Sequence, residues 1–197
     1  AQIYYFTPIF NLNFSTKDTQ KDFGEIILKK IDEEKFKIIK EDFVGKTISP
    51  PGYLYKLGWI IETKVPFKND KECEEELAKQ NFDKFLNISH LFEKGDLKIG
   101  KLYRNFTPLT ISSSLISQSF DMKFGNNFLK INKSSASDLK KFYNAYCELK
   151  FDKNWSFINV AIDRFSSSIL RTDPIDKIVD LNVALECLFS SAGETSL

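Results

Sequence analysis

Hydrophobic residues in the first part of the chain come in short runs rich in aromatic and β-branched side chains, a pattern typical of β-strands. Pro8 in the first run predicts a sheet edge or a bend, and Gly58 in a later run predicts a bulge or bend. Two runs flank the polar residues 32–34 and predict a β-hairpin, and residues 49–52 predict a turn. The predicted strands are residues 3–14, 25–31, 35–40, 53–65, 96–106 and 109–120.

One stretch inside this region has the spacing of an α-helix, from about residue 70 to about residue 93. Asn69 or Asp70 can cap its start, and acidic residues fill its first turns, where the helix dipole favours negative charge. Gly95 follows the last apolar residue, as expected of a C-terminal cap. The positions that carry the helical spacing are Ala78, Phe82, Phe85, Leu86, Ser89 and Phe92.

Helical spacing takes over in the last third of the chain. Ser135 or Ser137 can cap a helix that runs to about Leu149, and a second helix is predicted at about residues 155–170. A third follows, with Pro174 in its first turn.

The change in composition near residues 125–135 predicts a division into two domains. Residues 1–128 form a strand-rich N-terminal domain with one amphipathic helix, and residues 129–197 form the leading helices of a helical bundle. The predicted fold class is therefore α+β.

The third helix, at about residues 175–189, has apolar residues around most of its circumference, so it needs neighbours on nearly every side. Only two other helices are predicted beside it, and bundles of four or more helices enclose a member more readily. We therefore expect a further C-terminal helix, the N-terminal domain or a partner chain to cover it, and the bundle reads as C-terminally truncated. The apolar positions are Ile175, Ile178, Val179, Leu181, Val183, Leu185, Leu188 and Phe189.

Charge and composition exclude several classes of function. The net charge of +1 predicts no strong global field for nucleic acid or membranes. The three cysteines have no CxxC spacing, which disfavours a disulfide framework or a zinc site and indicates a reducing cytoplasm. No apolar run is long enough to span a bilayer. No phosphate-binding or metal-binding motif occurs, so we expect no cofactor and no metal.

The order of residues in 159–189 resembles the Apea-like HEPN family of bacterial proteins, in which a pattern like A-x-x-R-F-x-x-S precedes D-x-x-I-D-L-x-x-A-L-E-x-L-F. The resemblance is looser over residues 82–106 and does not extend to residues 1–60. The matching residues are Ala161, Arg164, Phe165, Ser168, Asp176, Val179, Asp180, Leu181, Ala184, Leu185, Glu186, Leu188 and Phe189.

This resemblance implies an antiparallel helical bundle, often dimeric, and in many members a metal-independent ribonuclease of antiphage defence or of a toxin–antitoxin system. The family's catalytic motif is an arginine followed after a short spacer by a histidine. An arginine can hold the scissile phosphate, and a histidine can move the proton of the attacking 2′-hydroxyl. The chain lacks the motif, because its only histidine is His90 and no arginine precedes it. The resemblance thus implies a ribonuclease whose catalytic residues lie outside this chain, with an N-terminal domain that senses a phage-derived or protein trigger.

Within the chain, the supporting site candidates are Glu186, Asn182 and Arg164. A carboxylate on an apolar helix must be paired or protonated, so Glu186 predicts a polar notch with Asn182, one turn earlier. The notch either orients a catalytic residue on the absent helix or forms a structural pair, for example with Arg164, and we favour the structural alternative.

Five other polar residues have simpler explanations. Arg171 and Asp173 are explained by helix capping and the dipole, and His90 by packing near a helix C-terminus. The pair Asp176 and Asp180 could bind a metal, but a solvated face is the favoured interpretation.

Three other functions remain open. Some HEPN-type bundles are non-enzymatic scaffolds or dimerisation modules, and this chain is predicted to dimerise through its helical domain in either case. A sheet of the N-terminal domain could instead bind a carbohydrate or peptide through Tyr53, Tyr55 and Trp59, although core positions are favoured. A lysine-rich hairpin could contact a nucleic-acid backbone, although a solvated edge is favoured. Its lysines are Lys29, Lys30, Lys35, Lys37 and Lys40.

Overall fold

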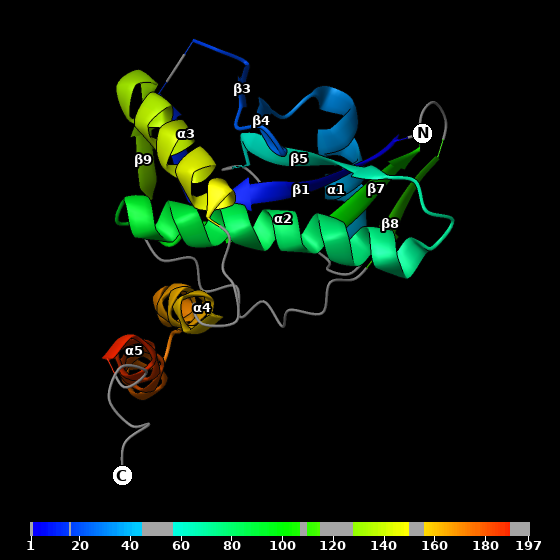
Figure 1. Cartoon of the computed structure of the whole chain (residues 1–197). Coiled ribbons are helices and arrows are strands. Elements are labelled where there is room, and N and C mark those ends of the chain that lie inside the picture. The colour runs from blue at the N-terminus through cyan, green and yellow to red at the C-terminus, as the bar shows by residue number, and fades with distance from the viewer. Residues whose placement is uncertain are drawn as a thin grey trace.

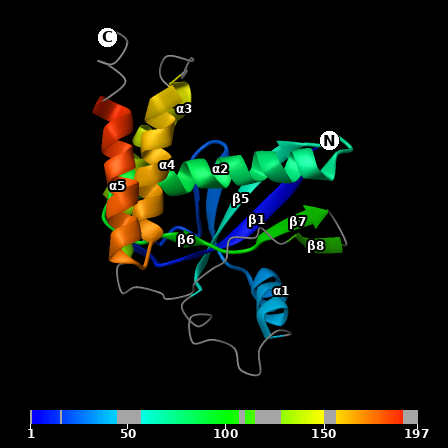
Figure 2. The ribbon, with the colours of Figure 1, turned by 90° about the horizontal axis from the view of Figure 1, so that it is seen from below.

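A computed structural model describes residues 2–15, 17–44, 57–106, 110–114, 128–149 and 156–189. Its architecture is mixed α+β, as predicted, with an antiparallel sheet and helices on both of its faces (Figures 1 and 2). The expected turn at residues 49–52, together with Tyr53 and Tyr55, lies outside the described residues. The strands are β1 (Gln2–Phe10), β2 (Leu12–Ser15), β3 (Gln20–Asp22), β4 (Ile26–Lys30), β5 (Trp59–Pro66), β6 (Lys98–Ile99), β7 (Leu102–Phe106), β8 (Thr110–Ser114) and β9 (Leu129–Asn132). The helices are α1 (Glu33–Val44), α2 (Lys71–Phe92), α3 (Lys133–Glu148), α4 (Ser156–Leu170) and α5 (Pro174–Phe189).

The main sheet has the order β3-β4-β5-β1-β7-β8, with β6 also paired to β1. The expectation that Pro8 marks an edge strand is wrong, because β1 lies between β5 and β7. Pro8 falls after the last β7 pair, Phe6↔Tyr103, and before the first β6 pair, Ile9↔Ile99. A proline without an N–H group is tolerated where the ladder changes partner. The single predicted strand 3–14 is divided at Asn11, whose φ of 59° lies in the left-handed region.

The predicted hairpin of residues 25–31 and 35–40 is also wrong. The first segment contains β4, which pairs with β3 and β5, but the second belongs to α1. The Asp32 carboxylate accepts a hydrogen bond of 2.8 Å from the Lys35 N–H, as an N-cap does. Ile39 is fully buried, with Phe36 half-buried one turn earlier, so the short apolar run has helical rather than alternating burial.

Alternate residues of β1 face two different cores. Tyr5 and Ile9 belong to the core under α2, whereas Phe6 and Phe10 face the opposite core, where Ile39 of α1 packs. Figure 2 shows α1 and α2 on opposite sides of the sheet. This two-sided burial explains why β1 is apolar at almost every position.

Helix α2 confirms the prediction for residues 70–93. The Asp70 side chain accepts a hydrogen bond of 3.1 Å from the Cys73 N–H and caps the helix. The C-terminal cap is Glu93 rather than Gly95. Gly95 instead lies against β9, where a Cβ atom would come within 2.7 Å of the Leu129 backbone. Its lack of a side chain permits this close approach.

Helix α3 packs against the N-terminal part of the chain and shares its core. Strand β9 pairs in parallel with β2, and Leu139 and Tyr143 of α3 belong to the same core as α2 and the main sheet. Asn132 caps α3, and Ser135 completes a capping box, so Ser135 lies inside the helix rather than before it. The division between residues 128 and 129 therefore falls within a shared core.

Helices α4 and α5 follow as a hairpin, connected by residues 171–173. They pack along one another, and α4 also contacts α2 (Figure 2). Ala161 of α4 and Ala184 of α5 are small and buried, which lets the two helices pack closely. The larger helical bundle that the sequence predicts, and its further C-terminal helix, remain predictions.

Candidate functional site

Asp180 is the polar centre of the α4–α5 hairpin. Its carboxylate accepts a hydrogen bond of 2.8 Å from Arg171 Nε and one of 3.1 Å from Arg164 Nη1. Its side chain is only 3% exposed, whereas both arginines are about half exposed. The hydrogen bond from Arg171 holds the pKa of Asp180 below its ordinary value. The expectation that Asp180 belongs to a solvated face is wrong, although it holds for the exposed Asp176.

Glu186 and Asn182 are exposed on α5 in this chain, and the polar notch that the sequence predicts stays a prediction. Arg164, which the sequence suggested as the partner of Glu186, contacts Asp180 instead. The three candidates therefore do not converge on one site. Any role of Glu186, Asn182 or Arg164 in catalysis stays a prediction. Asp173 caps α5 as expected, since its carboxylate accepts hydrogen bonds from the N–H groups of Ile175 and Asp176.

The apolar residues of α5 point mainly away from α4. Phe189 is 76% exposed and Ile175 72%, while the small Ala184 and the charged Asp180 face the neighbouring helix. A surface helix normally buries its apolar side and exposes its polar side, whereas α5 exposes its apolar side and buries Asp180. The exposed apolar face consists of Ile175, Ile178, Val179, Leu185, Leu188 and Phe189.

His90 of α2 is packed against α4, as the sequence suggested. Its Nε2 lies 3.0 Å from the Leu97 carbonyl oxygen and its Nδ1 lies 2.7 Å from Ser166 Oγ. Because a carbonyl only accepts, Nε2 carries the proton and Nδ1 accepts from the serine hydroxyl. Burial lowers the pKa of His90 to about 4, so the ring is neutral at ordinary pH.

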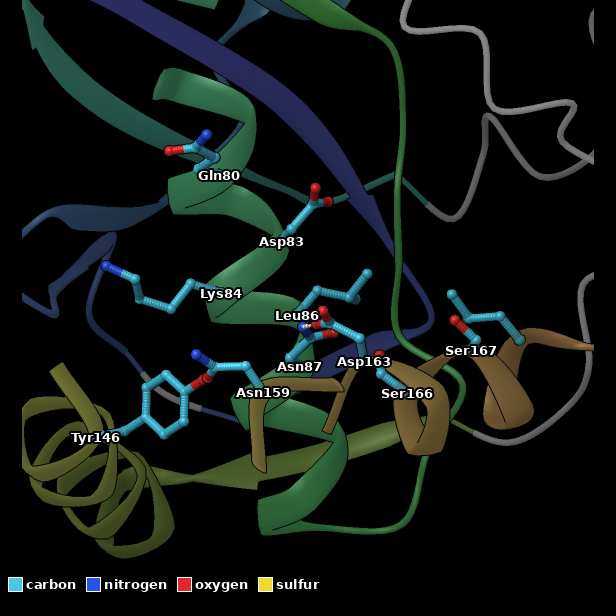
Figure 3. Close-up of a pocket in the computed structure, with 11 residues that line it drawn as sticks. Gln80, Asp83, Lys84, Leu86, Asn87, Tyr146, Asn159, Asp163, Ser166 and Ser167 are labelled. Atoms are coloured by element: carbon cyan, nitrogen blue, oxygen red, sulfur yellow. Dashed lines mark hydrogen bonds between the residues drawn. The ribbon is translucent and has the colours of Figure 1, made fainter. Parts of the chain in front are cut away.

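A polar pocket of about 510 Å³ lies where α2, α3 and α4 meet (Figure 3). We call it the α2–α4 pocket. Asn87 Nδ2 donates a hydrogen bond of 2.6 Å to Asp163 across it, and the Tyr146 hydroxyl donates one of 2.9 Å to Asn159. The side chains that define the pocket are Gln80, Asp83 and Asn87 of α2, Tyr146 of α3, and Asn159 and Asp163 of α4.

Two carboxylates give the α2–α4 pocket an unusual electrostatic character. Desolvation, with the charges of Asp163 and Glu76, raises the pKa of Asp83 to about 6, against a lowering effect of Lys79. Desolvation also raises the pKa of Asp163, against the hydrogen bond from Asn87. Asp83 can therefore hold or release a proton near neutral pH, which a general acid or base requires. Sequence analysis missed this residue, because only the packing of α4 against α2 brings Asp163 near it.

A second pocket, of about 560 Å³, opens on another side of the same junction. We call it the β9–α4 pocket. It contains three lysines from three separate segments: the turn after α2, strand β9 and helix α5. Sequence analysis did not single out these lysines. Its defining residues are Glu93, Lys94, Asp96, Lys130, Phe165 and Lys177.

Two of the five lysines of the rejected hairpin have structural partners, and the other three are exposed. Lys29 and Lys35 both form ion pairs with Glu62 of β5, and the Lys35 pair measures 3.2 Å. Trp59 is half-buried, and its ring packs edge-on against Phe14 with centroids 4.9 Å apart. The core interpretation of Trp59 is thus confirmed.

Within the described ranges, no group of three or more His, Cys, Asp or Glu side chains is arranged to hold a metal ion. In the same ranges, no helix combines the length and apolarity needed to cross a membrane. Searches of protein-family models, curated proteins and solved structures gave no match to the chain.

Proposed function

We propose that this chain belongs to a cytoplasmic HEPN-type ribonuclease of bacterial antiphage defence or of a toxin system. In this proposal the α4–α5 hairpin takes part in a larger helical bundle that cleaves RNA as a dimer, and the sheet domain binds a phage-derived or protein trigger. The observation that carries the proposal is the exposed apolar face of α5. The sequence predicted that this helix needs more neighbours than the chain supplies.

The size of that face argues for helical neighbours. Fully burying one large apolar side chain stabilises a protein by roughly 1.5–3 kcal/mol. Ile178 is 58% exposed and Leu185 is 52% exposed, so much of that stabilisation is not realised here. A helix packed along α5 would cover both residues, as in an antiparallel bundle.

In this proposal, the catalytic arginine and histidine are residues other than Arg164, Arg171 and His90. Arg164 and Arg171 are both paired with Asp180, and His90 is buried and neutral. A phosphate-binding arginine must instead have donors free for the substrate. The 197 residues alone should therefore not cleave RNA.

The decisive experiment compares the complete natural gene product with residues 1–197. Each is incubated with labelled tRNA and mRNA in the presence of a chelator, and the ends of any products are analysed. The proposal predicts cleavage by the complete protein only, with 2′,3′-cyclic phosphate ends. A complete reading frame without an arginine–histidine motif, or robust cleavage by repurified residues 1–197, would refute it.

The second candidate is a non-enzymatic HEPN-like scaffold or dimerisation module. It is favoured by the engagement of His90, Arg164 and Arg171 in contacts within the chain. It predicts that the complete protein associates through α5 but never cleaves RNA.

The apolar face itself is tested with the double substitution Ile178→Glu and Leu185→Glu in the complete protein. Both candidate functions predict that it abolishes association measured by light scattering, while the circular dichroism spectrum is retained. Exposed Asp176→Lys and Asn182→Glu on the same helix serve as the control, because they change polar positions only. Unchanged association of the Ile178/Leu185 variant would contradict both candidates.

A further inference from the structure

We propose that the α2–α4 pocket binds a small aliphatic amine, whose ammonium group would lie at the carboxylates of Asp83 and Asp163. The pocket shares no residue with the exposed apolar face of α5. The inference therefore depends neither on RNA cleavage nor on association of the chain.

The carboxylate of Asp83 is a charge that the fold compensates only in part. Asp83 is half-buried on α2, and it makes no hydrogen bond or ion pair within the described part of the chain. Two acidic residues, Glu76 and Asp163, act on it against one lysine, Lys79. A cation in the pocket would neutralise this charge, so its binding is favoured.

Lys84 also lines the pocket, but its ammonium group is engaged elsewhere. Its Nζ donates a hydrogen bond of 3.0 Å to Glu25, and Figure 3 shows the side chain pointing away from Asp83 and Asp163. Arg164, which follows Asp163 in the sequence, is paired with Asp180. Among the described residues that line the pocket, no cation is therefore directed at its two carboxylates.

Acceptor oxygens surround the same space. Asn87 lies one turn after Asp83 on α2, and its Nδ2 donates a hydrogen bond of 2.6 Å to Asp163 Oδ1. This contact orients the amide so that Asn87 Oδ1 is left as an acceptor. It also leaves Asp163 Oδ2 without a hydrogen bond among the described residues. An ammonium group has three N–H donors and accepts nothing, so these oxygens suit it.

Aliphatic side chains provide a surface for the hydrocarbon part of the ligand. Leu86 of α2 is buried and Leu170 of α4 is half-buried, and both line the pocket. Methylene groups gain free energy when they leave water for such a surface. The stem of a lysine lies along apolar residues in the same way while its ammonium group stays at a polar site.

A metal ion fits the pocket less well than an organic cation does. Among the described residues, no three His, Cys, Asp or Glu side chains are grouped as metal ligands, and Mg²⁺ and Ca²⁺ take six or more oxygen ligands. The volume of about 510 Å³ lies within the range of pockets that hold small molecules.

The test is calorimetric titration of the complete 197-residue chain at pH 7.5 and low salt, where screening is weak. The probes are putrescine, butylamine and 1,4-butanediol, which share a four-carbon chain and differ in charge. We expect both amines to bind at millimolar concentration and the diol to bind at least about tenfold more weakly. Equal binding of the diol, or no binding of either amine, would overturn the proposal. Displacement of putrescine by an equal concentration of Mg²⁺ would also overturn it, because the pocket would then be a metal site.

The ammonium ion tests the aliphatic surface, since it carries the charge without the hydrocarbon chain. It should bind at least about tenfold more weakly than butylamine. Equal binding of the two would show that Leu86 and Leu170 do not contact the ligand, and the assignment to an aliphatic amine would fail.

Matched variants locate the binding. The double substitution Asp83→Asn and Asp163→Asn keeps the shape of both side chains and removes their charge, and it should weaken putrescine binding at least about tenfold. The control, Asp138→Asn and Asp176→Asn, removes the same charge from exposed positions outside the pocket. Equal binding by the two double variants would show that the amine does not bind at these carboxylates. Thermal unfolding of each variant confirms that the fold is retained.

The pH dependence of binding provides a separate readout for Asp83. Burial, with the charges of Asp163 and Glu76, raises the pKa of Asp83 to about 6, against the effect of Lys79. At pH 5 about nine-tenths of this carboxyl is protonated, so putrescine should bind about tenfold more weakly than at pH 7.5. The single variant Asp83→Asn should show a much smaller fall. The same fall in the variant would show that Asp83 does not hold the ammonium group, which contradicts the proposal.

Discussion

His90 Nδ1 accepts a hydrogen bond of 2.7 Å from the Ser166 hydroxyl, and this contact joins α2 to α4. Ser166 also lines the α2–α4 pocket, and His90 lines the β9–α4 pocket, so the pair separates the two. Nδ1 accepts in this contact only while the imidazole is neutral, and protonation would reverse its direction and place a charge on a buried ring. Acid should therefore loosen the attachment of α4 to the sheet domain.

The first prediction concerns this histidine and pH. The pKa of His90 is about 4 in the folded chain, against about 6.5 unfolded, so the unfolded state binds more protons between these values. Its contribution to stability is complete above about pH 6.5 and is lost as pH falls toward 4. We expect a loss on the order of 2 kcal/mol between about pH 7 and pH 5. Urea unfolding is measured as a function of pH for the chain and for the His90→Gln variant. Because His90 is the only histidine, the difference between the two profiles gives its contribution to stability. Parallel pH profiles for the two proteins would contradict it.

The second prediction concerns Asp83, which should lower the stability of the fold as pH rises, whereas His90 lowers it as pH falls. Its folded pKa of about 6 lies above the ordinary value of 3.8, so the folded state binds more protons between these values. The ionised carboxyl thus destabilises the fold above about pH 6. Asp83→Asn should raise the free energy of unfolding at pH 8 by about 1–2 kcal/mol and have little effect near pH 4. Exposed Asp138→Asn is the control and should leave stability at pH 8 within about 0.5 kcal/mol. A loss of stability in Asp83→Asn would contradict the assignment.

The third prediction concerns the hairpin of α4 and α5. Asp180→Asn removes the negative charge that two arginines share, and should destabilise α5 by about 2 kcal/mol. The half-exposed arginines can return to water, which limits the loss. Hydrogen exchange of the α5 amides measures the effect. Asp176→Asn, an exposed position on the same helix, should change exchange by much less. Equal exchange in the two variants would show that the pairing does not hold the hairpin.

The fourth prediction concerns the close approach of Gly95 to β9. A Cβ atom would come within 2.7 Å of the Leu129 Cα and N atoms, so Gly95→Ala must displace the strand. We expect a loss of about 1–3 kcal/mol in the free energy of unfolding, measured with urea. At Gly58 a Cβ would meet nothing within 4 Å, so Gly58→Ala should be neutral or stabilising by up to about 1 kcal/mol. The reverse order of stability would show that β9 does not pack on this glycine.

Local signals explain which elements the sequence predicted. Helix α2 has strong helical spacing, acids at its start and a capping aspartate, and all of these act within a few residues. Helix α1 carried a signal of the same kind in Asp32, Glu33 and Glu34. The sequence analysis nevertheless assigned residues 35–40 to a strand, because a short apolar run is compatible with either a strand or a helix.

Tertiary context decided the remaining features. Pro8 suggests an edge by its chemistry, yet a change of partner strand allows it in the middle of the sheet. On α5, the expectation that charged residues face solvent was wrong for Asp180, because Arg164 of α4 and Arg171, which follows α4, provide it with partners. The two pockets were unpredictable for the same reason, since each combines residues from at least three separate segments.

The parallel pairing of β2 with β9 has a consequence for how the protein is made. Leu12 of β2 pairs with Leu129 of β9. Strand β2 is synthesised early, so it stays without this partner until β9 has been synthesised. Until β9 emerges, β2 has no partner strand, and of the contacts described above Phe14 can make only the one with Trp59. Non-local closures of this kind are slow, and they expose nascent apolar segments to aggregation or chaperone capture. Stalling translation before residue 129 should therefore leave the N-terminal strands accessible to protease.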